Sequence, residues 1–387
     1  MSTQVGYKGA APFTLRVLGA AVVVLALAGG AGGAIAAPPA QGAAAVDPAW
    51  ATGLSSPRGL KFGPDGYLYV AEGGAGGTNP APLGDYGNCT AGLTGPGQYY
   101  GSNTGSRISR IDTSGGVTTF VDNLPSSGAP IPGPDGLVSG VGDLAFVGDT
   151  MYAVLAGAGC SHGVPDIPNA LIRINADHTW TQVADLGAYL RAHPVADPTD
   201  PVTGDFEPDG TFYSLIAVRG DLYTIEPNMG ELLKVTTDGA ISRVIDFSAA
   251  LGHVVPTALA YHGNFYVGNL GRFPQDVGSS NVWKVTPSGN VKVDTTGFNM
   301  VLGLVFDGRG RMYVLEMSGG QSLPTPFTGR VTRVDPSGKR TVIADGGNGL
   351  FFPTAIAIGP DGNLYVSNQG FGLGAGTGTI AKIDLTD

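Results

Sequence analysis

Six tyrosines recur along the chain, and the residues that follow them are the first candidates for chemistry. The tyrosines are Tyr69, Tyr152, Tyr223, Tyr266, Tyr313 and Tyr365. Three positions after each of them stand Glu72, Leu155, Glu226, Asn269, Glu316 and Asn368. Carboxylate and amide oxygens suit Ca²⁺ or Mg²⁺, or they can hydrogen-bond a polar ligand. If these side chains converge, they form a binding or metal site.

The same pattern has a structural interpretation. Each polar side chain could cap loop amides at the end of its own strand, and Leu155 interrupts the ring of oxygen ligands. Converging acids also repel one another unless something compensates their charge. Arg58 is the one cation expected beside the three glutamates, either to balance them or to bind an anionic group of a ligand. Both interpretations stay open on the sequence alone.

The tyrosines belong to a repeated hairpin that must position these side chains. In the first copy, residues 59–72, an apolar strand is followed by the turn Pro64-Asp65-Gly66 and an alternating strand. A third and an outer strand follow in most repeats. Each third strand carries a basic residue at one register, for which we expect a structural role. These residues are Arg110, Arg173, Lys234, Lys284, Arg333 and Lys382.

The repeats predict an all-β fold, a six-bladed β-propeller of four-stranded antiparallel blades. The spacing of the later repeats matches propeller blades of about 40–50 residues. Only five outer strands can be found, and residues 49–54 have the pattern of the sixth. We expect this N-terminal strand to complete the last blade and remove the open sheet edges. The tyrosine strands would then all end at one face, the axial mouth.

Three insertions interrupt the early repeats, at residues 73–106, 156–169 and 187–210, with a helical turn predicted at 186–192. Long insertions in a compact repeat are where function concentrates. Cys89 and Cys160 lie in the first two of them. In an exported protein a lone cysteine pair favours a disulfide, which would staple the two loops.

One short motif looks catalytic but lacks the necessary context. Residues 159–163, Gly-Cys-Ser-His-Gly, have the letters of a nucleophile elbow. That motif needs a strand before it and a helix after it. The proline-containing continuation at 164–168 excludes the helix, so no catalytic role is assigned to Ser161.

The N-terminal residues predict export. Lys8 and Arg16 precede an apolar centre at 17–27, and Ala34-Ile35-Ala36 resembles a cleavage site. We therefore divide the chain into a signal peptide (1–36), a linker (37–48) and the propeller (49–387), located outside the cell. An uncleaved membrane anchor is the alternative. The net charge of −10 disfavours nucleic acid and anionic lipid, and after cleavage we expect a monomer without membrane contact.

Two stretches resemble a known family. The hairpin at residues 57–72 resembles NHL-type propellers. The stretch Glu207-Pro208-Asp209-Gly210, with the hairpin at 221–230 after it, resembles the ScyD/ScyE family, exported proteins named from scytonemin-pigment gene clusters. The resemblance implies a six-bladed propeller outside the cytoplasm. It implies no particular reaction.

Two functional hypotheses follow. In the first, the chain is a non-catalytic binding or scaffold propeller without a defined cofactor. Its mouth would receive a small polar ligand, a glycan or a protein, contacted by Glu72, Glu226, Asn269, Glu316, Asn368 and Arg58. In the second, it is a divalent-metal-dependent hydrolase or lyase, like the gluconolactonase-like and strictosidine-synthase-like propellers. Ca²⁺ or another divalent cation would then be held at this ring, with Glu226 or Glu316 as base or metal ligand.

Overall fold

A computed structural model describes residues 44–82, 98–129, 136–198 and 207–385. The predicted signal peptide and Cys89 lie outside the described residues, so export and the bridge between Cys89 and Cys160 stay predictions. Within the described ranges, no helix is both long and apolar enough to cross a membrane.

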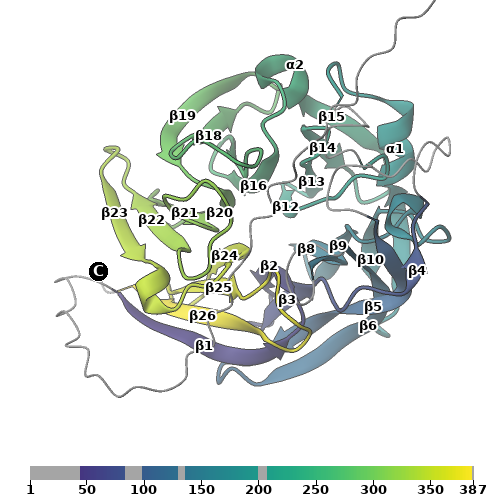
Figure 1. The fold of residues 1–387 in the computed structure, drawn as a ribbon, viewed down its shortest axis with the longest axis horizontal. Helices are drawn as coiled ribbons and strands as arrows, with labels where there is room; N and C mark the ends of the chain where they lie inside the picture. Colours follow the sequence, from purple (N-terminus) through teal and green to yellow (C-terminus); the bar gives the residue numbers. More distant parts are fainter. Residues whose placement is uncertain (1–43, 83–97, 130–135, 199–206, 386–387) are drawn as a thin grey trace, which may run out of the picture. The chain divides into compact units, whose positions relative to one another are not determined.

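The described residues form six antiparallel sheets arranged as the blades of a propeller, as predicted (Figure 1). Blade 1 contains β2 (Pro57–Phe62), β3 (Leu68–Glu72), β5 (Tyr100–Ile111) and β6 (Val117–Ala129). Blade 2 contains β8 (Val141–Val147), β9 (Thr150–Leu155), β10 (Ala170–Ile174) and β11 (Trp180–Asp185). Blade 3 contains β12 (Ser214–Val218), β13 (Asp221–Glu226), β14 (Glu231–Val235) and β15 (Ile241–Asp246).

The second half of the ring repeats this pattern. Blade 4 contains β16 (Pro256–Tyr261), β17 (Phe265–Asn269), β18 (Ser280–Val285) and β19 (Val291–Phe298). Blade 5 contains β20 (Val301–Phe306), β21 (Met312–Glu316), β22 (Arg330–Val334) and β23 (Arg340–Ala344). Blade 6 contains β24 (Ala355–Ile358), β25 (Leu364–Asn368), β26 (Gly378–Asp384) and the N-terminal β1 (Ala45–Leu54). The first strand of each blade lies nearest the centre (Figure 1).

The N-terminal strand closes the ring, as predicted. β1 pairs antiparallel with β26, and Ala51 lies opposite Ile380. The neighbouring Trp50 ring packs edge-on against Tyr365, with ring centroids 5.0 Å apart. The strand begins at Ala45, inside the predicted linker, because residues 45–47 pair with the end of β26.

The recurring tyrosine holds the turn that precedes it. The Tyr69 hydroxyl donates to Asp65 Oδ2 at 2.7 Å, and that of Tyr365 donates to Asp361 Oδ2 at 3.0 Å. The basic residue of the third strand stands directly opposite the tyrosine in these blades, as Lys382 does opposite Tyr365. Lys382 Nζ lies 3.0 Å from Asp361. The basic residues therefore act inside their own blades, in agreement with the structural role expected for them.

Blade 1 is larger than the sequence predicts. Strand β5 begins at Tyr100, inside the insertion predicted at 73–106, and β6 continues to Ala129. Two short strands, β4 (Asn79–Pro80) and β7 (Leu137–Ser139), extend this sheet. Much of the described part of the first insertion is thus strand.

Two short helices follow outer strands. The predicted turn is helix α1 (Leu186–Ala192), and α2 (Phe247–Leu251) was not predicted. Asp185 and Asp246 cap these helices. The side chain of each accepts a hydrogen bond from the backbone amide three residues later, that of Ala188 or Ala249. The 3₁₀ turns η2 (Cys160–His162) and η3 (Gly346–Asn348) lie between strands.

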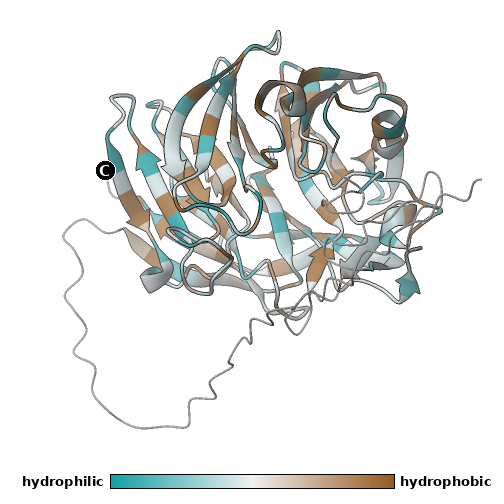
Figure 2. Cartoon of the chain, turned by 45° about the horizontal axis from the view of Figure 1, so that its top comes forward, coloured by the Kyte–Doolittle hydropathy of each residue, from teal (hydrophilic) through white to brown (hydrophobic). Residues whose placement is uncertain are grey.

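Hydrophobic residues recur along the strands, and hydrophilic residues occupy many of the connecting turns (Figure 2). The buried apolar side chains form clusters that join neighbouring blades. One cluster joins Val154 and Leu171 of blade 2 to Leu215 and Leu222 of blade 3. The turn between third and outer strands reaches the preceding blade. A Cβ on Gly239 would lie 2.4 Å from the Val183 carbonyl oxygen, so this approach requires glycine.

Candidate functional site

The carboxylates predicted at the mouth are buried, and they accept hydrogen bonds from other groups of the propeller. Glu72 accepts from Arg107 Nε at 2.7 Å and from the Ser55 amide at 2.6 Å, and also from the Ser109 hydroxyl. Glu226 accepts from three backbone amides, those of Thr211, Asn228 and Met229, at 3.1, 3.1 and 2.6 Å. Both side chains are completely buried.

The other members of the predicted ring behave in the same way. Glu316 accepts from the Asn299 amide at 2.8 Å. Asn269 accepts from the Asn281 amide at 2.7 Å and donates to the Val254 carbonyl at 3.0 Å. Asn368 accepts from the Phe351 amide at 2.8 Å and donates to the Gly349 carbonyl at 3.1 Å.

These contacts agree with the structural interpretation, in which each residue fastens loops at its own strand end. A ligand-binding role for the five residues stays a prediction. Burial raises the pKa of Glu226 to about 8 and also raises that of Glu316. Among the described residues, no group of three or more His, Cys, Asp and Glu side chains could hold a metal ion.

Arg58, expected beside the three glutamates, has a hydrogen bond to a backbone carbonyl. Its guanidinium donates to the Val138 carbonyl oxygen, and the cation beside Glu72 is Arg107. Arg58 instead lies near Tyr213, whose pKa is raised by burial while Arg58 opposes the rise.

Short polar side chains at the starts of the inner strands tie neighbouring blades together. Ser214 donates to the Thr257 carbonyl, and Thr257 in turn donates to the Val301 carbonyl, both at 2.6 Å. Thr354 donates to the Pro57 carbonyl at 2.7 Å, across the closing seam.

Asp143 links blade 2 to both of its neighbours. It accepts from the Leu215 amide at 2.8 Å and from Lys61 Nζ at 3.4 Å, so it joins blades 1, 2 and 3. Burial raises the pKa of Asp143, and Lys61 opposes the rise.

Apolar side chains from blades 3 to 6 pack together at the mouth, and the buried ones come from blades 5 and 6. We call this group the mouth cluster. Its buried members are Met300, Leu302, Met317 and Phe352, and its partly exposed members are Tyr213, Leu270, Phe351 and Phe371. All eight stand beside the mouth ends of inner or second strands. The Tyr213 hydroxyl donates to the Thr354 carbonyl at 2.7 Å, from blade 3 to the opposite blade 6.

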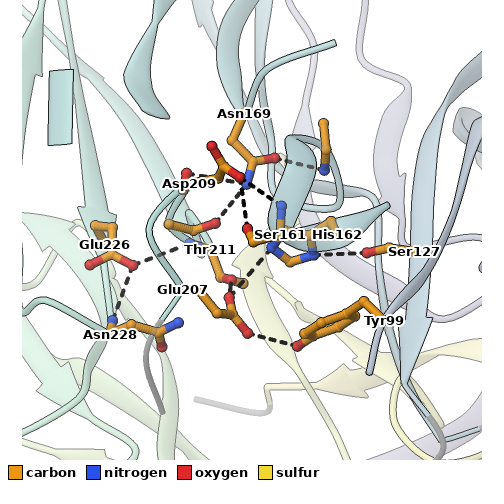
Figure 3. Close-up of polar contacts among 12 residues, drawn as sticks. Tyr99, Ser127, Ser161, His162, Asn169, Glu207, Asp209, Thr211, Glu226 and Asn228 are labelled. Carbon is orange, nitrogen blue, oxygen red and sulfur yellow. Dashed lines mark hydrogen bonds and ion pairs between the residues drawn. The ribbon is translucent and has the colours of Figure 1, made fainter. Parts of the chain in front are cut away.

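A second polar cluster joins the insertions of blades 1, 2 and 3 (Figure 3). Glu207 stands at its centre and accepts from the Tyr99 hydroxyl at 2.7 Å and from the Thr211 hydroxyl. His162 Nε2 lies 3.5 Å from Glu207 Oε2, while His162 Nδ1 shares a 2.9 Å hydrogen bond with Ser127. We call these residues the insertion latch.

Asp209 adds a second ion pair to the insertion latch. It accepts from the Ser161 amide at 2.9 Å and from the Ser161 hydroxyl at 2.8 Å, and it pairs with Arg191 of helix α1. Asn169 donates to the Gly210 carbonyl at 2.6 Å. The loop at 207–211 is thereby bound to the insertion of blade 2 and to α1.

The insertion latch fastens loops and does not expose a nucleophile. His162, Ser127 and Ser161 are at most 1% exposed. The Ser161 hydroxyl donates to Asp209 Oδ2. Burial lowers the pKa of His162, but Glu207 and Asp209 outweigh it and raise the pKa above the ordinary value.

Sequence reasoning missed the role of Glu207 and Asp209. Both belong to the Glu207-Pro208-Asp209-Gly210 stretch that carries the family resemblance. A glutamate and an aspartate two residues apart in a long insertion were the only signal available. Their partners Tyr99, His162 and Arg191 are distant in sequence, so the pairing could not be read from spacing.

Comparison with known proteins shows the fold alone. The structure is similar to that of a putative oxidoreductase (glucose dehydrogenase) from Thermus thermophilus. The match covers 88% of this chain and 100% of the other, with a TM-score of 0.51 and 18% sequence identity. A second similar structure is that of another glucose dehydrogenase. This match covers 88% of this chain and 99% of the other, with a TM-score of 0.50 and 14% sequence identity. A putative gluconolactonase is similar over 88% of this chain and 92% of its own, with a TM-score of 0.49 and 13% identity. No protein-family model and no curated protein sequence matches the chain.

Proposed function

We propose that this protein is an exported, non-catalytic binding propeller of the ScyD/ScyE type. We further propose that it holds an uncharged ligand with an apolar face at the mouth cluster. The observation that carries the proposal is the distribution of polar and apolar groups at the mouth. The predicted oxygen ligands are bound inside the blades, whereas aromatic side chains remain partly exposed beside the axis.

The chemistry of the mouth cluster supports this ligand class. Ligand sites are lined mainly by apolar and aromatic side chains with a few polar groups that fix orientation. Here Phe351 and Phe371 supply aromatic surface, and Tyr213 and Arg58 supply the polar groups. Met300 and Met317 can adapt their shape to a ligand. The ties between neighbouring blades give this surface a rigid frame.

The test is a thermal-shift screen followed by titration of each compound that raises the melting temperature. The names of the two glucose dehydrogenases make neutral mono- and oligosaccharides the first set, and planar uncharged aromatic compounds form the second. Binding should weaken at least about tenfold in Phe371→Ser, because a buried aromatic contact is lost. Tyr67→Ser, at the turn on the opposite face, is the matched control and should bind as the wild type does.

Two results would contradict the proposal. One is a compound whose binding is unaffected by Phe371→Ser but abolished by a folded Glu316→Gln variant. The other is turnover of a bound sugar or lactone that requires a divalent cation, which would restore the enzyme hypothesis.

A further inference from the structure

Large apolar side chains are exposed together on the loops that follow β17 and β21. They are Phe273, Val277, Leu323 and Phe327, with 45%, 62%, 48% and 63% of their surfaces exposed. We call these four residues the rim surface. They account for four of the nine large hydrophobic side chains that are exposed in the described ranges. Such a concentration marks an interaction surface.

The two loops are fixed to one another and form one surface. The backbone amide of Gln275 donates to the backbone carbonyl of Ser322 at 3.0 Å. Asn299 donates to the Gln321 carbonyl and accepts from the Gly278 amide, both at 3.0 Å. A surface held in this way loses little conformational entropy when a partner binds.

Phe327 is presented to solvent by a constrained backbone. Its φ of 54° lies in the left-handed region, which is unusual for a bulky residue. Its ring packs edge-on against Phe351, with centroids 4.6 Å apart. The exposed ring is thus held in place from below.

The charges of the rim loops are balanced and exposed. Arg272 and Asp276 are the only charged residues in 270–279, and the loop 317–329 has none. Both side chains are exposed, and neither has an ion-pair partner among the described residues. Two copies of a protein with a net charge of −10 repel one another elsewhere on their surfaces. This neutral apolar area is where a second copy can approach.

We infer that the rim surface is a two-fold interface between two copies of this chain. In a two-fold dimer the same patch meets itself, so Arg272 of one copy can face Asp276 of the other, twice. The apolar residues beside them would be buried between the copies. This replaces the monomer expected from the sequence, and it does not depend on a ligand at the mouth cluster.

The experiment is to measure the molar mass of the purified protein by sedimentation velocity over a wide concentration range. The wild type should be a dimer, and Phe327→Ser should shift it to the monomer. Val342→Ser, which changes another exposed side chain on β23, should remain a dimer. Thermal unfolding of each variant shows that it is folded.

A charge exchange tests the two-fold arrangement itself. Arg272→Asp and Asp276→Arg should each weaken dimerisation at least about tenfold, and the two together should restore it. A wild type that is monomeric at every concentration would overturn the inference, even if it bound neutral lipid vesicles through the rim. A dimer that the double exchange fails to restore would overturn the proposed two-fold contact.

Discussion

The glutamates that the sequence suggested as ligand-binding groups are buried in the propeller. Glu72, Glu226 and Glu316 have their oxygens taken by amides, hydroxyls or guanidinium groups of the propeller wall. A buried carboxylate without such partners would cost several kcal/mol. These contacts fasten loops at the strand ends, and a repeat pattern alone cannot distinguish such contacts from ligand binding.

The insertion latch should make stability depend on pH in a defined direction. The pKa of His162 is raised in the folded protein, so its charged form adds stability that is complete below about pH 6.5 and is lost as pH rises through the folded pKa. Glu207, Asp209, Tyr99 and Arg191 are the titratable groups around it. His162→Gln should therefore destabilise the protein more at pH 6 than at pH 9.

Urea unfolding at several pH values measures this difference. The matched control is His262→Gln, which removes an exposed histidine on the turn after β16. An equal loss of stability at both pH values for His162→Gln would show that its charge contributes nothing to the latch.

Glu226 should also make the protein less stable as pH rises, and here burial itself is the cause of the raised pKa. Its pKa of about 8 exceeds the ordinary value of 4.5, so the folded state binds the proton more tightly. Unfolding free energy should then decrease as pH rises from 4.5 to 8, by up to about 5 kcal/mol from this group. Glu226→Gln should lack this part of the pH dependence when unfolding is followed at pH 5, 7 and 9. A variant with the wild-type pH profile would contradict the assignment.

At the scale of the elements, the hairpins and their turns were predictable and the insertions were not. The tyrosine, the turn aspartate and the basic residue opposite lie within one blade, so their spacing repeats in the sequence. Helix α1 could be anticipated, and α2 has the same aspartate cap, which was overlooked. The extended β5 and the insertion latch depend on contacts between blades, which leave no periodic signal.

The close approach of turns to neighbouring blades can be tested with two glycines. Gly239 and Gly338 occupy equivalent turns with φ of 97° and 83°, but only Gly239 faces a carbonyl at 2.4 Å, and nothing lies within 4 Å of a Cβ on Gly338. Gly239→Ala should cost about 2–4 kcal/mol and Gly338→Ala about 1 kcal/mol, measured by urea unfolding. Equal costs would mean that the contact with Val183 does not constrain the turn.

At the scale of the whole molecule, the count of outer strands predicted both the six blades and the borrowed N-terminal strand. What the sequence could not show is which polar residues face the axis, because two interpretations of the strand ends were compatible with the same pattern. The mouth cluster was also missed. Its members come from separate loops, so no single stretch reveals it.

Ring closure makes Leu54 important to the stability of the whole propeller. This side chain is fully buried in β1 and packs in a cluster that contains Leu60 of blade 1 and Ile380 of blade 6. Leu54→Ala should lower the unfolding free energy by about 2–4 kcal/mol, and the exposed Val293→Ala should change it by less than about 0.5 kcal/mol. A small effect of Leu54→Ala would indicate that the closing strand contributes little.

We propose that the carboxylates at the mouth ends of the second strands fasten loops and do not hold a ligand. The most direct measurement is the melting temperature of the wild type and of Glu316→Gln, each with and without millimolar Ca²⁺. We predict that Glu316→Gln melts at a lower temperature than the wild type and that Ca²⁺ changes neither value. A rise in the wild-type melting temperature with Ca²⁺ that is absent in Glu316→Gln would contradict this account.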